Sequence, residues 1–144
     1  MDNKFEKRFS ELQADMVSVC LEYCAHQCEQ VFLHVINEDE SIFTNFFFRA
    51  DGIMRKKSDL PGAAAPVSIE RQKAALSAIT QAARSAGKLC EAYGRPLPTE
   101  YRLVYDVAAG SLRAEYSYDP ITSADKSCRA VSEDWFRQQA ARRA

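Results

Sequence analysis

The sequence has 144 residues, of which 47% are hydrophobic and 27% are charged, and its formal net charge at pH 7 is −1. A chain of this size and composition is typical of one globular domain, spanning residues 1–144, that folds without a metal or a disulfide. The near-zero charge argues against a nucleic-acid-binding protein, and the lack of an apolar run of about 18 residues argues against a membrane span.

The N-terminal segment MDNKFEKRFS is charged and has no apolar signal-peptide core, so a cytoplasmic location is expected. The cysteine count is five, an odd number that fits free thiols in a reducing compartment.

A long helix is predicted over residues 4–30, because apolar residues recur there at steps of three and four. The predicted stripe consists of Phe5, Phe9, Leu12, Met16, Val19, Cys20 and Tyr23. Strands are predicted at 31–36, 41–49 and 53–57, with a polar turn at 37–40 and a hairpin turn at Asp51-Gly52. In the second of these strands Phe43 and Phe47 share one face, and Phe46 and Phe48 share the other.

Residues 58–66 are expected to form a loop, and a second long helix is predicted over 68–93. Ser68 is the expected N-cap, Gly94 the expected residue after the helix end, and two prolines prevent continuation. The buried stripe of this helix is predicted to contain Ile69, Leu76, Ile79, Ala83, Ala86, Cys90 and Tyr93.

Residues 100–119, EYRLVYDVAAGSLRAEYSYD, contain two alternating runs around a turn with Gly110, which predicts an antiparallel hairpin. One face of the hairpin is apolar and the other carries charge of both signs, so one side of the sheet is expected to face water. Ser132 is then predicted to cap a short helix over 133–143, with Glu133 and Asp134 at its positive end.

This order, α-β-β-β-α-β-β-α, predicts an α+β fold. The expected architecture is an antiparallel sheet of about five strands with two long helices packed on one face and a short C-terminal helix.

Three thiols recur one helical turn apart, at Cys20, Cys24 and Cys28. Such a face could bind a metal or have a redox role, but buried packing is the favoured interpretation. Neither His26 nor His34 lies in a recognisable motif, and no nucleotide, metal or nucleophile signature occurs. The sequence therefore predicts a protein that is not an enzyme and has no cofactor or metal. A thiol-dependent enzyme using Cys24, Cys28 or Cys90 stays an alternative.

Acidic residues cluster at three places and form either a solvated surface or a patch for a basic partner. Exposed aromatic residues would support a binding role, although Trp135 could instead pack the terminal helix onto the sheet. The candidate partner-binding residues are Asp106, Glu115, Tyr116, Asp119, Glu133 and Trp135, together with Glu38, Asp39 and Glu40.

The aromatic hairpin SIFTNFFFRADGIMRKKSDL, the stretch EAYGRPLPTEYRLVYDVAAGSLRAEYSYD and the terminal EDWF resemble the YezG-like family of bacterial immunity proteins. The resemblance implies a protein that neutralises a secreted or contact-delivered toxin domain, often a nuclease, by binding it and without chemistry. The expected partner is a cognate toxin domain, expected to be basic if it is a nuclease, with no nucleic acid or membrane involved. The oligomeric state is left open. A small-molecule or regulatory binding domain without catalysis is the alternative.

Overall fold

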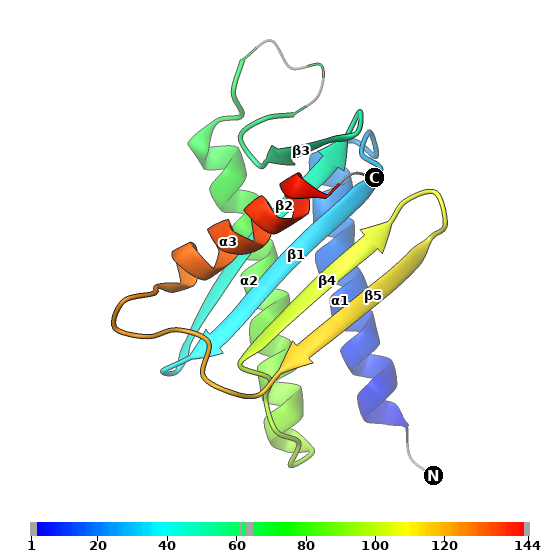
Figure 1. Cartoon of the computed structure of the whole chain (residues 1–144). Coiled ribbons are helices and arrows are strands. Elements are labelled where there is room, and N and C mark those ends of the chain that lie inside the picture. Colours follow the sequence, from blue (N-terminus) through cyan, green and yellow to red (C-terminus); the bar gives the residue numbers. More distant parts are fainter. Residues whose placement is uncertain (1–2, 61, 63–64, 143–144) are drawn as a thin grey trace.

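A computed structural model describes residues 3–60, 62 and 65–142. Its elements are α1 (Lys4–Tyr23), β1 (Gln30–Glu38), β2 (Ser41–Ala50), β3 (Ile53–Lys56), α2 (Ile69–Ala92), β4 (Glu100–Asp106), β5 (Ser111–Ser117) and α3 (Cys128–Ala141). The strands form one antiparallel sheet in the order β3-β2-β1-β4-β5 (Figure 1). The predicted α+β fold and order of elements are therefore confirmed.

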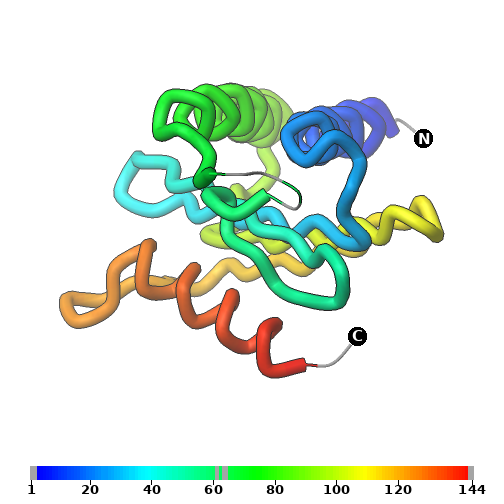
Figure 2. Tube along the Cα trace, turned by 90° about the horizontal axis from the view of Figure 1, so that it is seen from above, coloured from blue at the N-terminus to red at the C-terminus, as the bar shows by residue number. Residues whose placement is uncertain are grey.

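The sheet lies between two helical layers, with α1 and α2 on one face and α3 on the other (Figure 2). We call the α1–α2 side the inner face and the α3 side the outer face. The prediction that one whole side of the sheet faces water was wrong for the part beneath α3. There the indole of Trp135 packs on the rings of Phe32 and Phe47, at centroid distances of 5.8 and 5.0 Å.

The alternation of side chains explains why β1 and β2 are covered on both faces. Leu33 and Phe46 belong to the inner core, and Phe32 and Phe47 belong to a separate outer cluster. All four side chains are buried, as expected for central strands whose apolar residues are continuous rather than alternating. The predicted division of the phenylalanines of β2 between two faces is confirmed.

Two helix boundaries show how local backbone conformation limits a periodic pattern. α1 ends at Tyr23 and not at residue 30, because Ala25 and His26 have φ values of 51° and 58°, which no right-handed helix accommodates. α2 begins after Ser68, whose hydroxyl accepts a hydrogen bond from the backbone N–H of Arg71, so the predicted N-cap is confirmed.

The predicted stripe of α2 is buried only in its middle. Ile69 and Tyr93, at the two ends of the helix, are 62% and 43% exposed, so their assignment to the core was wrong. At about 1.5 Å per residue the 24 residues of α2 span about 36 Å, slightly more than the about 33 Å of the 10-residue strand β2, so the two ends of the helix lie at or past the limits of the sheet.

α3 begins five residues earlier than expected. Its N-cap is Ser127, which accepts from the backbone N–H of Ala130, and not Ser132. Ser132 lies inside the helix and is buried, where its hydroxyl accepts a hydrogen bond from Asn45 Nδ2 at 2.9 Å. Glu133 and Asp134 are consequently mid-helix residues, not N-terminal ones. The last residue of the predicted helix, Arg143, lies outside the described residues.

The two N-terminal hairpins are closed by tight turns whose residues have positive φ. Asp39 and Glu40 both have positive φ, as do Asp51 and Gly52, which gives the two-residue turns typical of twisted hairpins. The predicted polar turn at 37–40 is thus shorter, and β1 continues to Glu38. The predicted loop at 58–66 falls partly on residues 61, 63 and 64, which lie outside the described residues. None of the helices within the described ranges is both long and apolar enough to cross a membrane.

Candidate interaction surface

β5 is the last strand in the sheet order and forms one of the two edges of the sheet. Along the β1–β4 ladder, Val107 N donates to Glu29 O at 3.0 Å and Asn37 N donates to Thr99 O at 2.7 Å. Because backbone polar groups alternate in direction along a strand, the odd-numbered residues of β4 point toward β1 and the even-numbered ones toward β5.

The register then assigns the direction of each β5 residue. Even-numbered residues of β4 are paired with odd-numbered residues of β5, for example Arg102 with Glu115 and Val104 with Arg113. The backbone N–H and C=O groups of Leu112, Ala114 and Tyr116 therefore point away from β4. The described chain places no strand on that side, so β5 presents an open edge. We call this side of Ser111–Ser117 the β5 edge.

Apolar side chains surround the β5 edge on the inner face. Leu112, Tyr116 and Tyr118 are 39%, 42% and 56% exposed. The Tyr116 hydroxyl accepts a hydrogen bond from Gln13 Nε2 at 2.8 Å, and its ring lies 6.2 Å from that of Phe9. These contacts hold Tyr116 in one orientation and leave part of its ring for a partner.

A crevice of about 350 Å³ opens next to Tyr116, and we call it the Tyr116 crevice. Its walls are contributed by the start of α1, the segment after α2 and the end of β5. They include Phe5, Phe9, Arg95, Pro96, Pro98, Tyr116 and Tyr118.

The guanidinium of Arg95 shapes one wall of the Tyr116 crevice, because it lies 4.4 Å from the ring centroid of Phe5 and pairs with Glu6 at 3.1 Å. A second hollow of about 190 Å³ lies between α1 and Leu112, on the other side of the Gln13–Tyr116 contact. We call these two hollows, which the Gln13–Tyr116 contact separates, the groove along α1.

The predicted residues of the last hairpin are distributed around this edge. Glu115 is exposed on the outer face, opposite Arg102 in the register, and Arg113 lies two residues before it. The outer face of the hairpin is therefore mixed in charge. Asp119 lies two residues after the end of β5, and its backbone O accepts from Thr99 Oγ1 at 2.6 Å. Glu115, Tyr116 and Asp119 thus lie together along β5.

Asp106 lies at the opposite end of the hairpin. Its Oδ1 accepts from the backbone N–H of Ala109 at 3.0 Å and so helps to form the turn between β4 and β5.

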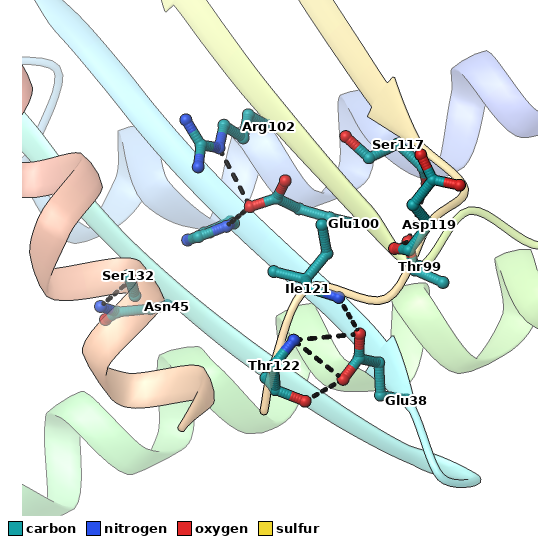
Figure 3. A network of polar contacts seen from close by, with 11 residues as sticks. Glu38, Asn45, Thr99, Glu100, Arg102, Ser117, Asp119, Ile121, Thr122 and Ser132 are labelled. Carbon is teal, nitrogen blue, oxygen red and sulfur yellow. Dashed lines mark hydrogen bonds and ion pairs between the residues drawn. The ribbon is translucent and has the colours of Figure 1, made fainter. Parts of the chain in front are cut away.

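Glu38 has a structural contact of its own (Figure 3). Its carboxylate accepts hydrogen bonds from the backbone N–H groups of Ile121 and Thr122 and from the Thr122 hydroxyl. These bonds, led by that of Ile121, lower the pKa of the Glu38 carboxyl. Glu38 therefore holds the segment between β5 and α3 against the end of β1, while Asp39 and Glu40 are exposed in the adjacent turn.

Trp135 does not lie on the surface that the prediction assigned to it. It is 3% exposed and packs inside the outer cluster, so its assignment as a direct partner contact was wrong. In the structure Trp135 packs the terminal helix onto the sheet, which is the alternative that the sequence also offered.

Glu133 lies beside a crevice of about 420 Å³ whose lining includes Lys57, Lys73 and Arg129. Its carboxylate pairs with Lys56 Nζ at 2.5 Å. The surroundings of Glu133 are therefore basic, and it is not part of an acidic patch.

A polar cluster beneath α3 involves His34, Glu100 and Arg102. His34 Nε2 lies 2.6 Å from Glu100 Oε2, which also accepts from Arg102 Nε at 3.0 Å. Burial, together with the charge of Arg102, lowers the pKa of His34 more than the hydrogen bond and charge of Glu100 raise it. Burial raises the pKa of Glu100, but the hydrogen bond and charge of His34, with those of Arg102, outweigh it and lower the pKa.

His34 is 0% exposed, and its ring lies 5.0 Å from that of Trp135. The imidazole is therefore enclosed between the sheet and α3, where its contacts with Glu100 and Trp135 help to order the outer cluster. Within the described ranges, no three His, Cys, Asp or Glu side chains are arranged to hold a metal ion.

The sequence matches no family model, and a comparison with characterised proteins finds no significant match. The resemblance to immunity proteins therefore stays a hypothesis that the quoted segments and the surface just described must support.

Several residues of this surface were not among the predicted ones. Phe5 and Leu112 were assigned to buried faces, because alternation and helical periodicity do not show which strand ends a sheet. Gln13 and Arg95 lie in no motif. The one available indication was Tyr118, an aromatic residue placed after the last alternating pair of the hairpin.

Proposed function

We propose that this protein is an immunity protein that binds and neutralises a cognate bacterial toxin domain by protein–protein contact. The observation that carries the proposal is the open β5 edge, with its outward backbone groups and the exposed side chains of Leu112, Tyr116 and Tyr118. The resemblance of the quoted segments to immunity proteins supports the same function.

The proposed binding mode is strand addition. An extended segment of the toxin pairs with the outward N–H and C=O groups of Leu112, Ala114 and Tyr116, and its apolar side chains enter the groove along α1. Tyrosines dominate the energetics of many interfaces, and Tyr116 is already held in place by Gln13. Glu115 and Asp119 would meet the basic groups of a nuclease toxin and speed its association.

The protein acts by covering or locking the toxin, in the cytoplasm that a contact-delivered toxin enters. Catalysis by the immunity protein is not required. The chemistry belongs to the toxin domain, and protection scales with the affinity and lifetime of the complex.

The test of the function begins with the neighbouring gene. Its C-terminal domain is expressed alone and together with this protein, and growth and complex formation are followed. We expect the domain alone to stop growth and the pair to grow and to co-purify. A harmless neighbour that forms no complex would contradict the immunity function.

The binding mode is tested with Ala114→Pro, which removes one outward N–H and leaves the β4–β5 ladder unchanged. Proline is tolerated where an edge N–H faces solvent, so the thermal midpoint should stay near that of the wild type. We expect toxin affinity to fall at least about tenfold, because one main-chain bond is lost and the paired strand is displaced. Ala114→Val, which retains the N–H, is the matched control and should bind within about threefold of the wild type.

Charge reversal tests the proposed contact of Glu115 and Asp119 with basic groups of the toxin. Glu115→Lys and Asp119→Lys should slow association and reduce its dependence on salt. Unchanged rates in both variants would remove this surface from the interface. A folded Ala114→Pro variant with wild-type affinity would in turn remove strand addition but not the immunity function.

A second candidate function is favoured by one observation, the Tyr116 crevice of about 350 Å³. That volume is within the range of small-molecule sites, and the aromatic walls would suit an aromatic or apolar ligand. A ligand that raises the thermal midpoint of the wild type but not of Tyr118→Arg would support a regulatory binding domain. A screen without such a ligand would speak against it.

A further inference from the structure

The turn that ends α1 brings two thiols together. Cys24 is the C-cap residue of α1, and the positive φ values of Ala25 and His26 bend the chain so that Cys28 returns toward it. The two sulfur atoms are 2.7 Å apart. This separation is only about 0.7 Å longer than a disulfide bond of about 2 Å.

The surroundings differ between the two sulfur atoms. A hydrogen bond from Cys28 lowers the pKa of Cys24 to about 7, helped by backbone N–H groups of the turn and opposed by burial. The same hydrogen bond raises the pKa of Cys28. Burial and the charge of Cys24 raise the pKa of Cys20, which lies one helical turn earlier. Cys24 is thus the thiol that ionises first, with Cys28 next to it.

We propose that Cys24 and Cys28 are a redox-active pair, a modification site at which hydroperoxides form an intramolecular disulfide. The two cysteines are 3% and 5% exposed, so the proposed oxidant is a small one and bulky oxidants are disfavoured. This inference is independent of the proposed function, because neither cysteine lies on the β5 edge or in the Tyr116 crevice.

The chemistry uses hydrogen peroxide as the oxidant. The Cys24 thiolate attacks one peroxide oxygen, the O–O bond breaks, and the products are a sulfenic acid on Cys24 and hydroxide, which takes up a proton to become water. The sulfur of Cys28 then attacks the sulfenic sulfur and loses its proton, the S–O bond breaks, and a second water leaves. Two thiols are oxidised by two electrons, and one peroxide is reduced to two waters.

The position of the pair gives the disulfide a structural effect. Immediately before it, the Tyr23 hydroxyl donates to Lys57 O, and Arg71 donates to Tyr23 O at 2.7 Å. The end of α1 is therefore tied to α2 and to the segment after β3. A disulfide would fix the turn between α1 and β1 at this junction, and in a reducing compartment the thiol pool would reverse it.

The experiment treats the reduced full-length protein with hydrogen peroxide and then counts free thiols by alkylation in denaturant. Five thiols are free before treatment, and three are expected after it, since five minus the two of the pair is three. The intact mass should fall by two hydrogen atoms with no oxygen gained. The oxidation rate should increase as pH rises through about 7, where Cys24 ionises.

Variants assign the bond, because Cys20, Cys24 and Cys28 share one tryptic fragment between Arg8 and Arg49. Cys24→Ala and Cys28→Ala should lose no thiols to a disulfide under the same treatment. Cys20→Ala is the matched control, one turn earlier and equally buried, and should still form the bond.

Three outcomes would overturn the proposal. They are five free thiols after treatment of the wild type, a gain of oxygen atoms without loss of a thiol pair, and a disulfide that persists in Cys28→Ala. The first two need no variant, so they decide the matter even if a variant fails to fold.

Discussion

Replacing Trp135 with alanine is expected to remove much of the stability of the fold. The indole is 3% exposed and contacts Phe32, Phe47 and the buried imidazole of His34. Truncating a buried Trp typically costs about 3–5 kcal/mol, part of it from the cavity left behind. The contact of the Arg102 guanidinium with the indole, at 5.2 Å, adds about 0.5–1 kcal/mol. A domain of this size is stable by roughly 5–15 kcal/mol, so about a quarter or more of the total is at risk.

Urea denaturation followed by far-UV circular dichroism measures this loss, since the variant has no tryptophan left to fluoresce. Trp135→Phe keeps an aromatic ring in the outer cluster and should cost clearly less. Tyr118→Ala, at a side chain 56% exposed, is the surface control and should stay within about 0.5 kcal/mol of the wild type.

This measurement distinguishes two interpretations of Trp135, as a packed core residue and as a partner contact. If Trp135→Ala costs less than about 1 kcal/mol, the indole is not packed between α3 and the sheet, and the outer cluster is wrong. If it costs about 3–5 kcal/mol, any loss of toxin binding in this variant reports unfolding and not a lost contact.

Three further outcomes are expected. The free energy of unfolding should fall as pH decreases below about 6.5, the ordinary pKa of histidine, because the pKa of buried His34 is lowered and the unfolded chain binds the proton first. A further loss should follow below about 4.5, the ordinary pKa of glutamate, because the pKa of Glu100 is lowered in the fold. A flat profile in urea titrations between pH 8 and 5 would contradict this. Ser127→Ala should cost about 1 kcal/mol in the same titration by removing the N-cap of α3, and no loss would mean that the helix begins elsewhere. Glu38→Ala should speed amide hydrogen exchange in residues 119–122 and leave exchange within the β1–β2 ladder unchanged; equal protection in both proteins would show that Glu38 does not hold this segment.

The elements that sequence reasoning predicted well are those set by local patterns. The Ser68 cap, the Asp51-Gly52 turn and the two faces of the last hairpin each depend on residues a few positions apart. The start of α3 was missed because Ser132-Glu133-Asp134 has the composition of a helix start. The helix begins instead at the local cap of Ser127, whose hydroxyl accepts from the backbone N–H of Ala130. The Ser132 hydroxyl accepts a hydrogen bond from the distant Asn45, a contact that the chain alone does not reveal.

A local indication of the true helix was nevertheless present. Val131 and Trp135 lie four residues apart, which places them on one side of a helix that must already include residue 131, and both are buried. The outer layer had an indication as well, because Phe32 and Phe47 lie on the opposite face from Leu33 and Phe46. Strands with apolar residues on both faces need a cover on both sides.

The order of the strands is the part that periodicity does not specify, and it is the part on which the proposed function depends. β4 could pair with β1 or with β3 after the long crossover through α2. Pairing with β1 leaves β3 and β5 as the two edges, and these edges are unlike each other. β3 has four residues, carries Arg55 and Lys56, and is flanked by α3 through the Lys56–Glu133 pair. Such short, charged and partly covered edges resist pairing with other chains.

β5 is longer and no helix of the described chain flanks its edge, although it too carries two charged residues, Arg113 and Glu115. It has seven residues, and its outward backbone groups belong to Leu112, Ala114 and Tyr116, none of which carries a charge. An open edge of this length can pair with strands of other chains and so promote aggregation, unless a partner covers it. The contrast between a short, partly covered edge at β3 and an open edge at β5 is therefore an argument that β5 has a partner. Ala114→Pro distinguishes a partner that pairs with the backbone of β5 from one that contacts only its side chains.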